Sequence, residues 1–260
     1  MARVARDPWT WLAQRTPARI ALGRTGASLP TREVLAFQLA LARARDAVHW
    51  VADTAALRAG LEALALEVLE VESAAVDRSL YLRRPDQGRR LSPTSRQALE
   101  RRISEPSDLV VVIGDGLSAA AVDAHAPSFI HAFLPYTLRW KLAPFIIAAG
   151  ARVALGDEIG EIVQARAVAV LIGERPGLSA PDSLGVYLTF APKRGRKDAE
   201  RNCISNIRPA GLSCPLAAFK LAWLLGEALR QSITGVGLKD ESDRVLGSRA
   251  PAPALLEHQA

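Results

Sequence analysis

The sequence is poor in cysteine, and its cysteines and histidines form no metal-binding pattern. Cys203 and Cys214 are the only cysteines among 260 residues and make no C-x-x-C pair. The four histidines include no i, i+4 pair of the kind that binds zinc from a helix. A chain of this length buries a core without disulfides. We therefore expect no metal site in this chain and a reducing, cytoplasmic environment.

Long hydrophobic runs are also missing. The longest stretch without Asp, Glu, Lys or Arg spans residues 124–138 and contains two histidines and two prolines. A membrane-spanning helix needs about 20 predominantly apolar residues. The first residues contain no apolar run of signal-peptide length. These features exclude a membrane segment and favour a cytoplasmic protein.

Lysine is scarce, since only five of the 33 basic residues are Lys. The net charge of +6 raises the hypothesis of RNA binding, which predicts strongly salt-dependent association. However, the charge alternates, with +5 over residues 1–50, −5 over 51–77 and +6 over 78–102. Aromatic residues are not interleaved with the arginines, as they are in many single-strand binders. Because Arg suits paired contacts at interfaces, a protein contact surface is favoured over nucleic acid.

Helical patterns dominate the first 105 residues. Thr31 is the expected N-cap of a helix with apolar residues at positions 34, 37, 41, 44 and 48. A second helix is expected over 54–71, an ordered loop over 79–91, and another helix from about Pro93. We predict that residues 1–105 form a mainly helical segment for subunit contacts.

Short apolar runs alternate with helical patterns after residue 105. The clearest strands are 109–113, 167–172 and 184–190, with shorter candidates at 145–147 and 152–155. Such runs suit strands that are covered on both faces. Residues 106–246 are therefore predicted to form an α/β, Rossmann-like domain, with an open, mostly parallel sheet flanked by helices. A late helix opens at Pro215, and residues 247–260 are predicted to be a mobile tail.

Residues 114–119 read Gly-Asp-Gly-Leu-Ser-Ala after a predicted strand, which is the G-x-G-x-x-A form of a dinucleotide-binding turn. That unit also needs an acidic residue about 20 positions further on to hold the ribose. No Asp or Glu lies between Asp123 and Asp157. A stand-alone NAD-binding oxidoreductase is thus the alternative hypothesis. A tight strand-to-helix turn that faces another ligand is favoured.

Three further segments carry polar groups. Asp123-Ala124-His125 partly matches the D-x-H-x-x-G pattern of corrinoid modules, but Ser128 stands at the last position, so a surface or capping histidine is favoured. The loop 173–178 is either a ligand-binding edge or a simple turn. Cys203 has no histidine base nearby, so it is expected to line a pocket rather than act as a nucleophile. Ligand-facing loops without a set of catalytic residues indicate that this chain supplies only half of an active site.

Seven segments, in order, resemble the small subunit of ethanolamine ammonia-lyase, an adenosylcobalamin-dependent enzyme. They span residues 16 to about 240 and are specific as a set. The matching segments are 16–26 (TPARIALGRTG), 81–91 (YLRRPDQGRRL), 115–118 (DGLS), 150–153 with 156–161 (GARV, GDEIGE), 173–178 (GERPGL), 183–187 (SLGVY) and 203–207 (CISNI).

The resemblance implies a lyase that is active only as a complex. In this family a large subunit holds ethanolamine and the small subunit closes over cobalamin at the interface, with the heterodimers forming a higher oligomer. An adenosyl radical begins the conversion of ethanolamine to acetaldehyde and ammonia. The family contacts carry over to Val153, Glu174 and Cys203 as cofactor-binding residues. No catalytic residue, cobalt ligand, nucleic acid or membrane contact is implied, and packing into a bacterial microcompartment stays open.

Overall fold

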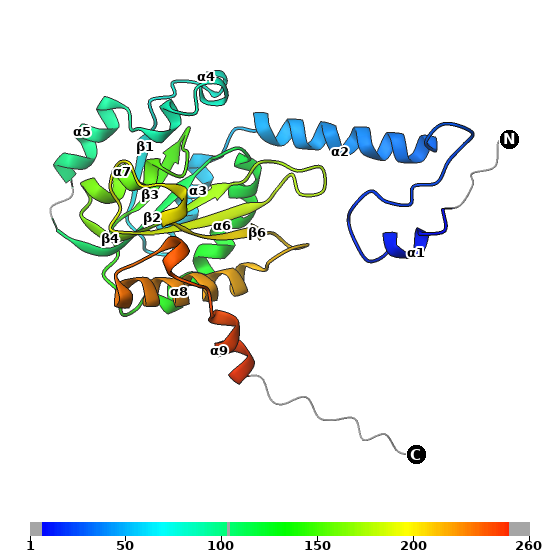
Figure 1. Cartoon of the computed structure of the whole chain (residues 1–260). Coiled ribbons are helices and arrows are strands. Elements are labelled where there is room, and N and C mark those ends of the chain that lie inside the picture. The colour runs from blue at the N-terminus through cyan, green and yellow to red at the C-terminus, as the bar shows by residue number, and fades with distance from the viewer. Residues whose placement is uncertain (1–6, 103–104, 250–260) are drawn as a thin grey trace, which may run out of the picture.

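A six-stranded sheet forms the centre of the computed structural model, which describes residues 7–102 and 105–249. The strand order is β1-β3-β2-β4-β5-β6 (Figure 1). The first four strands in this order run parallel, whereas β5 is antiparallel to both of its neighbours. The strands are β1 Val68–Glu72, β2 Ser107–Gly114, β3 Phe145–Ala149, β4 Ala165–Gly173, β5 Leu184–Phe190 and β6 Asn202–Ile207.

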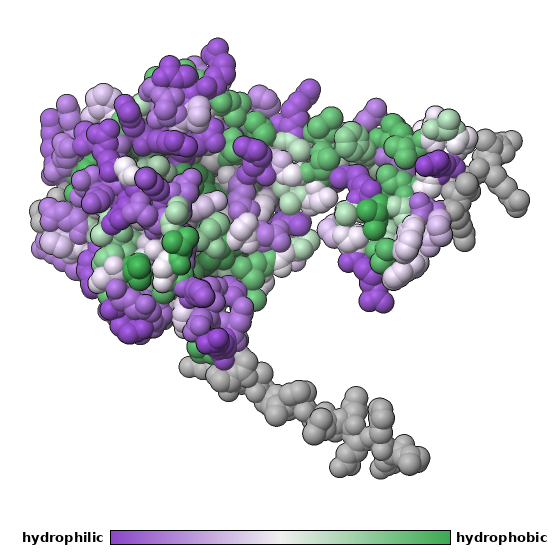
Figure 2. Space-filling view, viewed as in Figure 1, coloured by the Kyte–Doolittle hydropathy of each residue, from purple (hydrophilic) through white to green (hydrophobic). Residues whose placement is uncertain are grey.

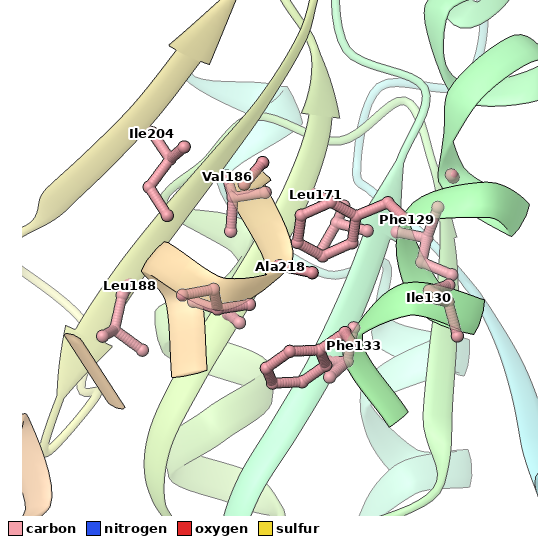
Figure 3. Close-up of a cluster of buried hydrophobic side chains, with 14 of the residues drawn as sticks. Phe129, Ile130, Phe133, Leu171, Val186, Leu188, Ile204 and Ala218 are labelled. Carbon is pink, nitrogen blue, oxygen red and sulfur yellow. The ribbon is translucent and has the colours of Figure 1, made fainter. Parts of the chain in front are cut away.

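Helices cover both faces of the sheet. Helices α3 Thr54–Glu62, α6 Ala119–Phe133 and α8 Cys214–Gln231 pack on one face, where Phe129, Phe133 and Leu171 belong to the core (Figure 3). Helices α5 Pro93–Arg102 and α7 Leu155–Ile162 cover the other face. Further helices after residue 50 are α4 Arg78–Arg83, η1 Gln87–Arg89, η2 Leu134–Tyr136, η3 Asp198–Glu200, η4 Gly235–Gly237 and α9 Ser242–Arg249.

Strand β2 contains an uninterrupted apolar run, residues 109–113, because this part of the strand is buried on both faces. Leu109, Val111 and Ile113 face the α6 side, whereas Val110 and Val112 face the α7 side. All five are at most 2% exposed. Successive side chains of a strand point to opposite faces, so a strand covered on both sides needs apolar residues at every position. The predicted α/β fold with a mostly parallel sheet is confirmed.

An N-terminal arm, residues 7–50, projects from this body and contains α1 Thr10–Ala13 and α2 Thr31–His49 (Figure 1). The helix predicted from Thr31 is confirmed, although Pro30 is its N-cap. Of its predicted apolar face, only Ala44 is buried, while Val34, Phe37 and Leu41 are 37, 42 and 52% exposed. Figure 2 shows apolar surface along the arm. Most of this face is therefore exposed, apart from the buried Ala44 and the stacking of Arg19 on Phe37 at 5.7 Å.

One predicted helix is too long, and one predicted strand is wrong. The helix expected over 54–71 ends at Glu62, because Ala65 takes a left-handed conformation (φ +58°) and Val68 begins an edge strand. The strand expected at 152–155 is a turn that leads into α7, because Gly150 (φ +65°) turns the chain out of β3. Strand β6 was not predicted.

Other predictions differ in detail from the structure. The segment 79–91 is ordered, as expected, but it contains most of α4 and all of η1. The helices at Pro93 and Pro215 are confirmed. Of the predicted tail, residues 247–249 end α9, and 250–260 lie outside the described residues. No helix of the described ranges is long and apolar enough to cross a membrane.

Candidate functional site

A hollow lies at the carboxyl edge of the sheet, where the connections from neighbouring strands leave to opposite faces. The chain leaves β2 through α6 on one face to reach β3, and leaves β3 through α7 on the other face to reach β4. The carboxyl ends of the neighbouring strands β2 and β3 therefore form a topological switch point, the usual ligand site of open α/β sheets, and the loop after β4 lies beside it. The hollow measures about 410 Å³ and is lined by Tyr81, Gly116, Leu117, Arg152, Val153, Ile172, Gly173, Glu174, Arg175 and Tyr187.

Glycines allow the loops after β2 and β4 to pack directly against each other at this point. Gly116 has φ +60°, and a Cβ placed on it would lie 2.3 Å from the carbonyl oxygen of Gly173. Leu117 N donates to the same carbonyl oxygen at 2.9 Å. The predicted turn 114–119 is thus a tight strand-to-helix turn, and Gly116 allows its close contact with the loop after β4.

Glu174 is held at one wall of the hollow by one of its carboxylate oxygens. Its Oε2 accepts hydrogen bonds from Ser183 Oγ at 2.6 Å and from Asn206 N at 3.2 Å. Its Oε1 lies against Gly185, where a Cβ would be 2.8 Å away. The loop 173–178 therefore has a specific architecture that fixes its carboxylate, which favours the ligand-edge interpretation over a simple turn.

Val153 forms part of the opposite wall, in the turn before α7. Arg152 N donates to Gly88 O at 2.8 Å, which fixes this turn to the segment after α4. The Arg152 guanidinium lies 4.2 Å from the ring centroid of Tyr81, and its Nε is buried with no hydrogen-bond partner among the described atoms. An unpaired buried donor is costly. Arg152 lines the hollow, so its guanidinium brings a positive charge to this wall.

Cys203 lies next to the hollow rather than in its lining. It is exposed on β6 and is paired in register with Tyr187, which does line the hollow. Desolvation of its sulfur raises the pKa of the Cys203 thiol, Glu174 acts in the same direction, and the Tyr187 hydrogen bond opposes them. Burial likewise raises the pKa of Tyr187. Both groups stay protonated at neutral pH, so Cys203 can contact a ligand but is a poor nucleophile.

A buried ion pair supports the walls, and the sequence analysis did not find it. Arg201 binds both carboxylate oxygens of Asp157, at 2.5 and 2.7 Å, and both side chains are at most 2% exposed. Arg201 also donates to Thr189 Oγ1 at 3.0 Å. The pair joins the residue before β6 to α7, so it fixes the segments that carry Cys203 and Val153. Arg201 stands two residues before Cys203, but its partner is distant in the chain.

Asp115 lies behind the hollow, in the turn after β2. Its Oδ1 accepts hydrogen bonds from Gly116 N and Ala151 N, both at 2.9 Å. Burial raises the pKa of Asp115, whereas the backbone N–H groups and Arg78 oppose that rise. Its hydrogen bonds tie the end of β2 to the end of β3, which is a structural role.

The Asp123–His125 pair lies in α6, away from the switch point. Asp123 accepts a hydrogen bond from Trp50 Nε1 at 2.8 Å, and His125 is buried with its Nε2 3.6 Å from Asp182 Oδ2. Within the described ranges, no group of three or more His, Cys, Asp or Glu could hold a metal ion. The prediction of a surface or capping histidine is wrong, because His125 is buried in the middle of α6.

Comparisons with known proteins agree on one family. The family described as "Ethanolamine ammonia-lyase light chain (EutC)" matches residues 6–239. Proteins named ethanolamine ammonia-lyase small subunit are similar over nearly the whole chain. That of Bradyrhizobium diazoefficiens is 59% identical over 95% of both chains, and that of Xanthomonas campestris pv. campestris is 55% identical over 93% of this chain and 90% of its own. One from Pseudomonas aeruginosa is 50% identical over 95% and 93%.

Proposed function

The chain belongs to the ethanolamine ammonia-lyase light chain family, and from this premise we propose that it binds adenosylcobalamin at an interface with a large subunit. The complex converts ethanolamine into acetaldehyde and ammonia, and the large subunit holds the substrate. This chain contributes no catalytic residue. The cytoplasmic location, free or inside a bacterial microcompartment, stays a prediction.

One observation carries the proposal: the three cofactor residues expected from the sequence gather around one switch-point hollow. Val153 and Glu174 line it, and Cys203 is paired with Tyr187 of its wall. These residues come from the turn before α7, the loop after β4 and strand β6. Chance would not bring three such distant positions to one ligand edge.

The groups around the hollow suit a large, amide-rich ligand. Glu174 receives both of its hydrogen bonds at Oε2, so its Oε1 is the oxygen we assign to a corrin amide. Val153, Leu117 and Ile172 supply apolar contact, and Arg152 supplies a positively charged guanidinium. Bound adenosylcobalamin supplies the radical chemistry. The protein side of the work is to bind, orient and shield.

A basic hollow next to the site suits the phosphate of the cofactor. It measures about 430 Å³ and shares Arg152 and Val153 with the first hollow. Arg89, Arg196, Lys197 and Arg201 also line it, against one acidic residue, Asp198. Arginine binds phosphate oxygens in a fork geometry that lysine lacks. A negatively charged phosphodiester beside Val153 would therefore be stabilised.

The arm is the surface we assign to subunit contacts. Apolar side chains on α2, including Leu35, Phe37, Leu39 and Leu41, are 42–59% exposed. Interfaces of obligate complexes are rich in such residues. Burying this helix on the large subunit would cover the apolar surface seen along the arm in Figure 2. Joining these heterodimers into a higher oligomer is part of the same proposal.

Co-expression with a large subunit of this family tests the proposal. We expect the two chains to co-purify through a tag on either one. The purified complex should retain added adenosylcobalamin through gel filtration, as its visible spectrum shows. Failure to co-purify would overturn the subunit assignment, and a complex that releases all corrinoid would overturn the cofactor assignment.

A further inference from the structure

Arg78 is the first residue of α4. It links the root of the arm, residues 48–53, to the turn after β2 that lines the cofactor hollow. Its Nε donates to Val48 O, near the end of α2, at 2.8 Å, and its Nη1 donates to Gly116 O at 2.7 Å. The guanidinium lies 3.6 Å from Asp115 Oδ2 and 4.7 Å from the ring centroid of Tyr81. One planar group therefore holds two carbonyls that are distant in the sequence.

The packing around this link is not continuous. A hollow of about 330 Å³ separates the root of the arm from the carboxyl edge of β1, β2 and β3, and Trp50, Leu57, Ile147 and Arg78 are among its lining residues. Solid apolar packing, which transmits strain well, is therefore interrupted between the root and this edge of the sheet. The other polar link from arm to site, Arg19 Nη2 to Leu178 O, is exposed and 3.4 Å long.

The root has a second, independent anchor on α6. Asp123 accepts a hydrogen bond from Trp50 Nε1 at 2.8 Å and one from Asp53 N at 3.3 Å. These contacts hold the end of the arm without reaching the turn after β2. Anchoring of the arm and contact with the turn are thus carried by different residues, Asp123 and Arg78, and can be separated by substitution.

We propose that Arg78 is a positioning residue that transmits docking of the arm on the large subunit to the turn 114–118. The inference rests on the proposed function of the arm. A rigid guanidinium holds Val48 O and Gly116 O at fixed separation, so a shift at the end of α2 is passed to Gly116. Gly116 packs on Gly173, so the same shift reaches both loops at the mouth of the hollow.

Amide hydrogen exchange of the complex without cobalamin tests this directly. In the wild-type complex we expect slower exchange than in the free chain at two places, the arm (31–50) and the turn (115–118). In Arg78→Gln the arm should keep its protection and the turn should lose it. Arg78→Lys, which has a single nitrogen and no planar fork, should also lose the protection of the turn while keeping a positive charge beside Asp115.

Two control variants separate this role from general destabilisation. Arg58→Gln removes an arginine of α3 that binds Glu62, Glu70 and Val68 O but neither the arm nor the turn, so it should behave as wild type. Asp123→Asn should weaken association of the subunits while leaving the turn protected in the complex that forms. Cobalamin affinity should fall roughly tenfold in Arg78→Gln, within the usual range of coupling between sites.

The outcomes distinguish this inference from the proposed function. If no complex forms with the large subunit, the proposed function fails. If the wild-type complex forms but its turn gains no protection, or if Arg78→Gln retains that protection, the role of Arg78 is overturned. Loss of protection at the turn in Arg58→Gln as well would also overturn it, because the effect would then not depend on the link.

Discussion

Gly173 lies so close to Ser118 that a Cβ on Gly173 would be 1.9 Å from the Ser118 carbonyl oxygen. This contact brings the end of β4 against the start of α6, beside the hollow that Gly173 helps to line. It explains why glycine ends the strand: any side chain would push the two loops apart.

Gly173→Ala should therefore destabilise the chain by about 3 kcal/mol, the upper end of common overpacking costs. Gly60→Ala is the matched control, because a Cβ at Gly60, inside α3, meets nothing within 4 Å. That control should stabilise the chain by about 0.5–1 kcal/mol. Urea unfolding followed by circular dichroism gives both values. Similar urea unfolding midpoints for the two variants would contradict this close contact between Gly173 and Ser118.

Glu174→Ala should weaken cobalamin binding by the complex roughly tenfold, the lower end of the effect of losing a hydrogen bond to a charged group. Glu174→Gln keeps an oxygen acceptor and should lose less. Glu161→Ala is the control, since Glu161 is an exposed carboxylate that accepts a hydrogen bond from Arg194 N away from the hollow. Titration with adenosylcobalamin, followed by absorbance, measures the affinity. Equal affinities for Glu174→Ala and Glu161→Ala would remove Glu174 from the site.

Cys203 should react slowly with iodoacetamide at pH 7.5. Its pKa is raised above 9.0, the ordinary value, mainly by desolvation, so its thiolate fraction is below that of a free cysteine. The rate should rise as the pH increases through and beyond 9. Measurement in a Cys214→Ser background by mass spectrometry isolates Cys203. A rate at pH 7.5 above that of glutathione would show a thiolate and contradict the raised pKa.

Polar substitution on the arm should weaken association without unfolding the chain. Phe37→Ser and Leu41→Ser change side chains that are 42 and 52% exposed, so the isolated chain should melt as before. Affinity for the large subunit should fall at least tenfold if these residues anchor the interface. Val236→Ser, at a residue 85% exposed on the body, is the control. Unchanged affinity in both arm variants would move the interface away from α2.

The central strands could be predicted from the sequence because they are buried on both faces. Strands β2, β4 and β5 are largely apolar, and each was predicted within two residues of its bounds. The edge strands β1 and β6 carry exposed polar residues at several positions, so their sequences resemble a helix end and a loop. Pairing with a neighbour, rather than local pattern, makes them strands.

The site could be predicted only in part. The resemblance supplied Val153, Glu174 and Cys203, and the loops at the carboxyl edge were visible as motifs. Tyr187 lies inside a predicted strand, and the sequence does not show which face of the sheet its side chain occupies. Arg78 and Arg152 were hidden in a chain rich in arginine, because their partners are backbone carbonyls and a ring that lie far away in the sequence.

Ammonia release from ethanolamine is the measurement that tests the account most directly. The assay combines this chain, the large subunit and adenosylcobalamin, and omits each in turn. We expect ammonia and acetaldehyde in equal amounts only when all three are present. Ammonia release by the large subunit and cofactor at the same rate without this chain would contradict the account.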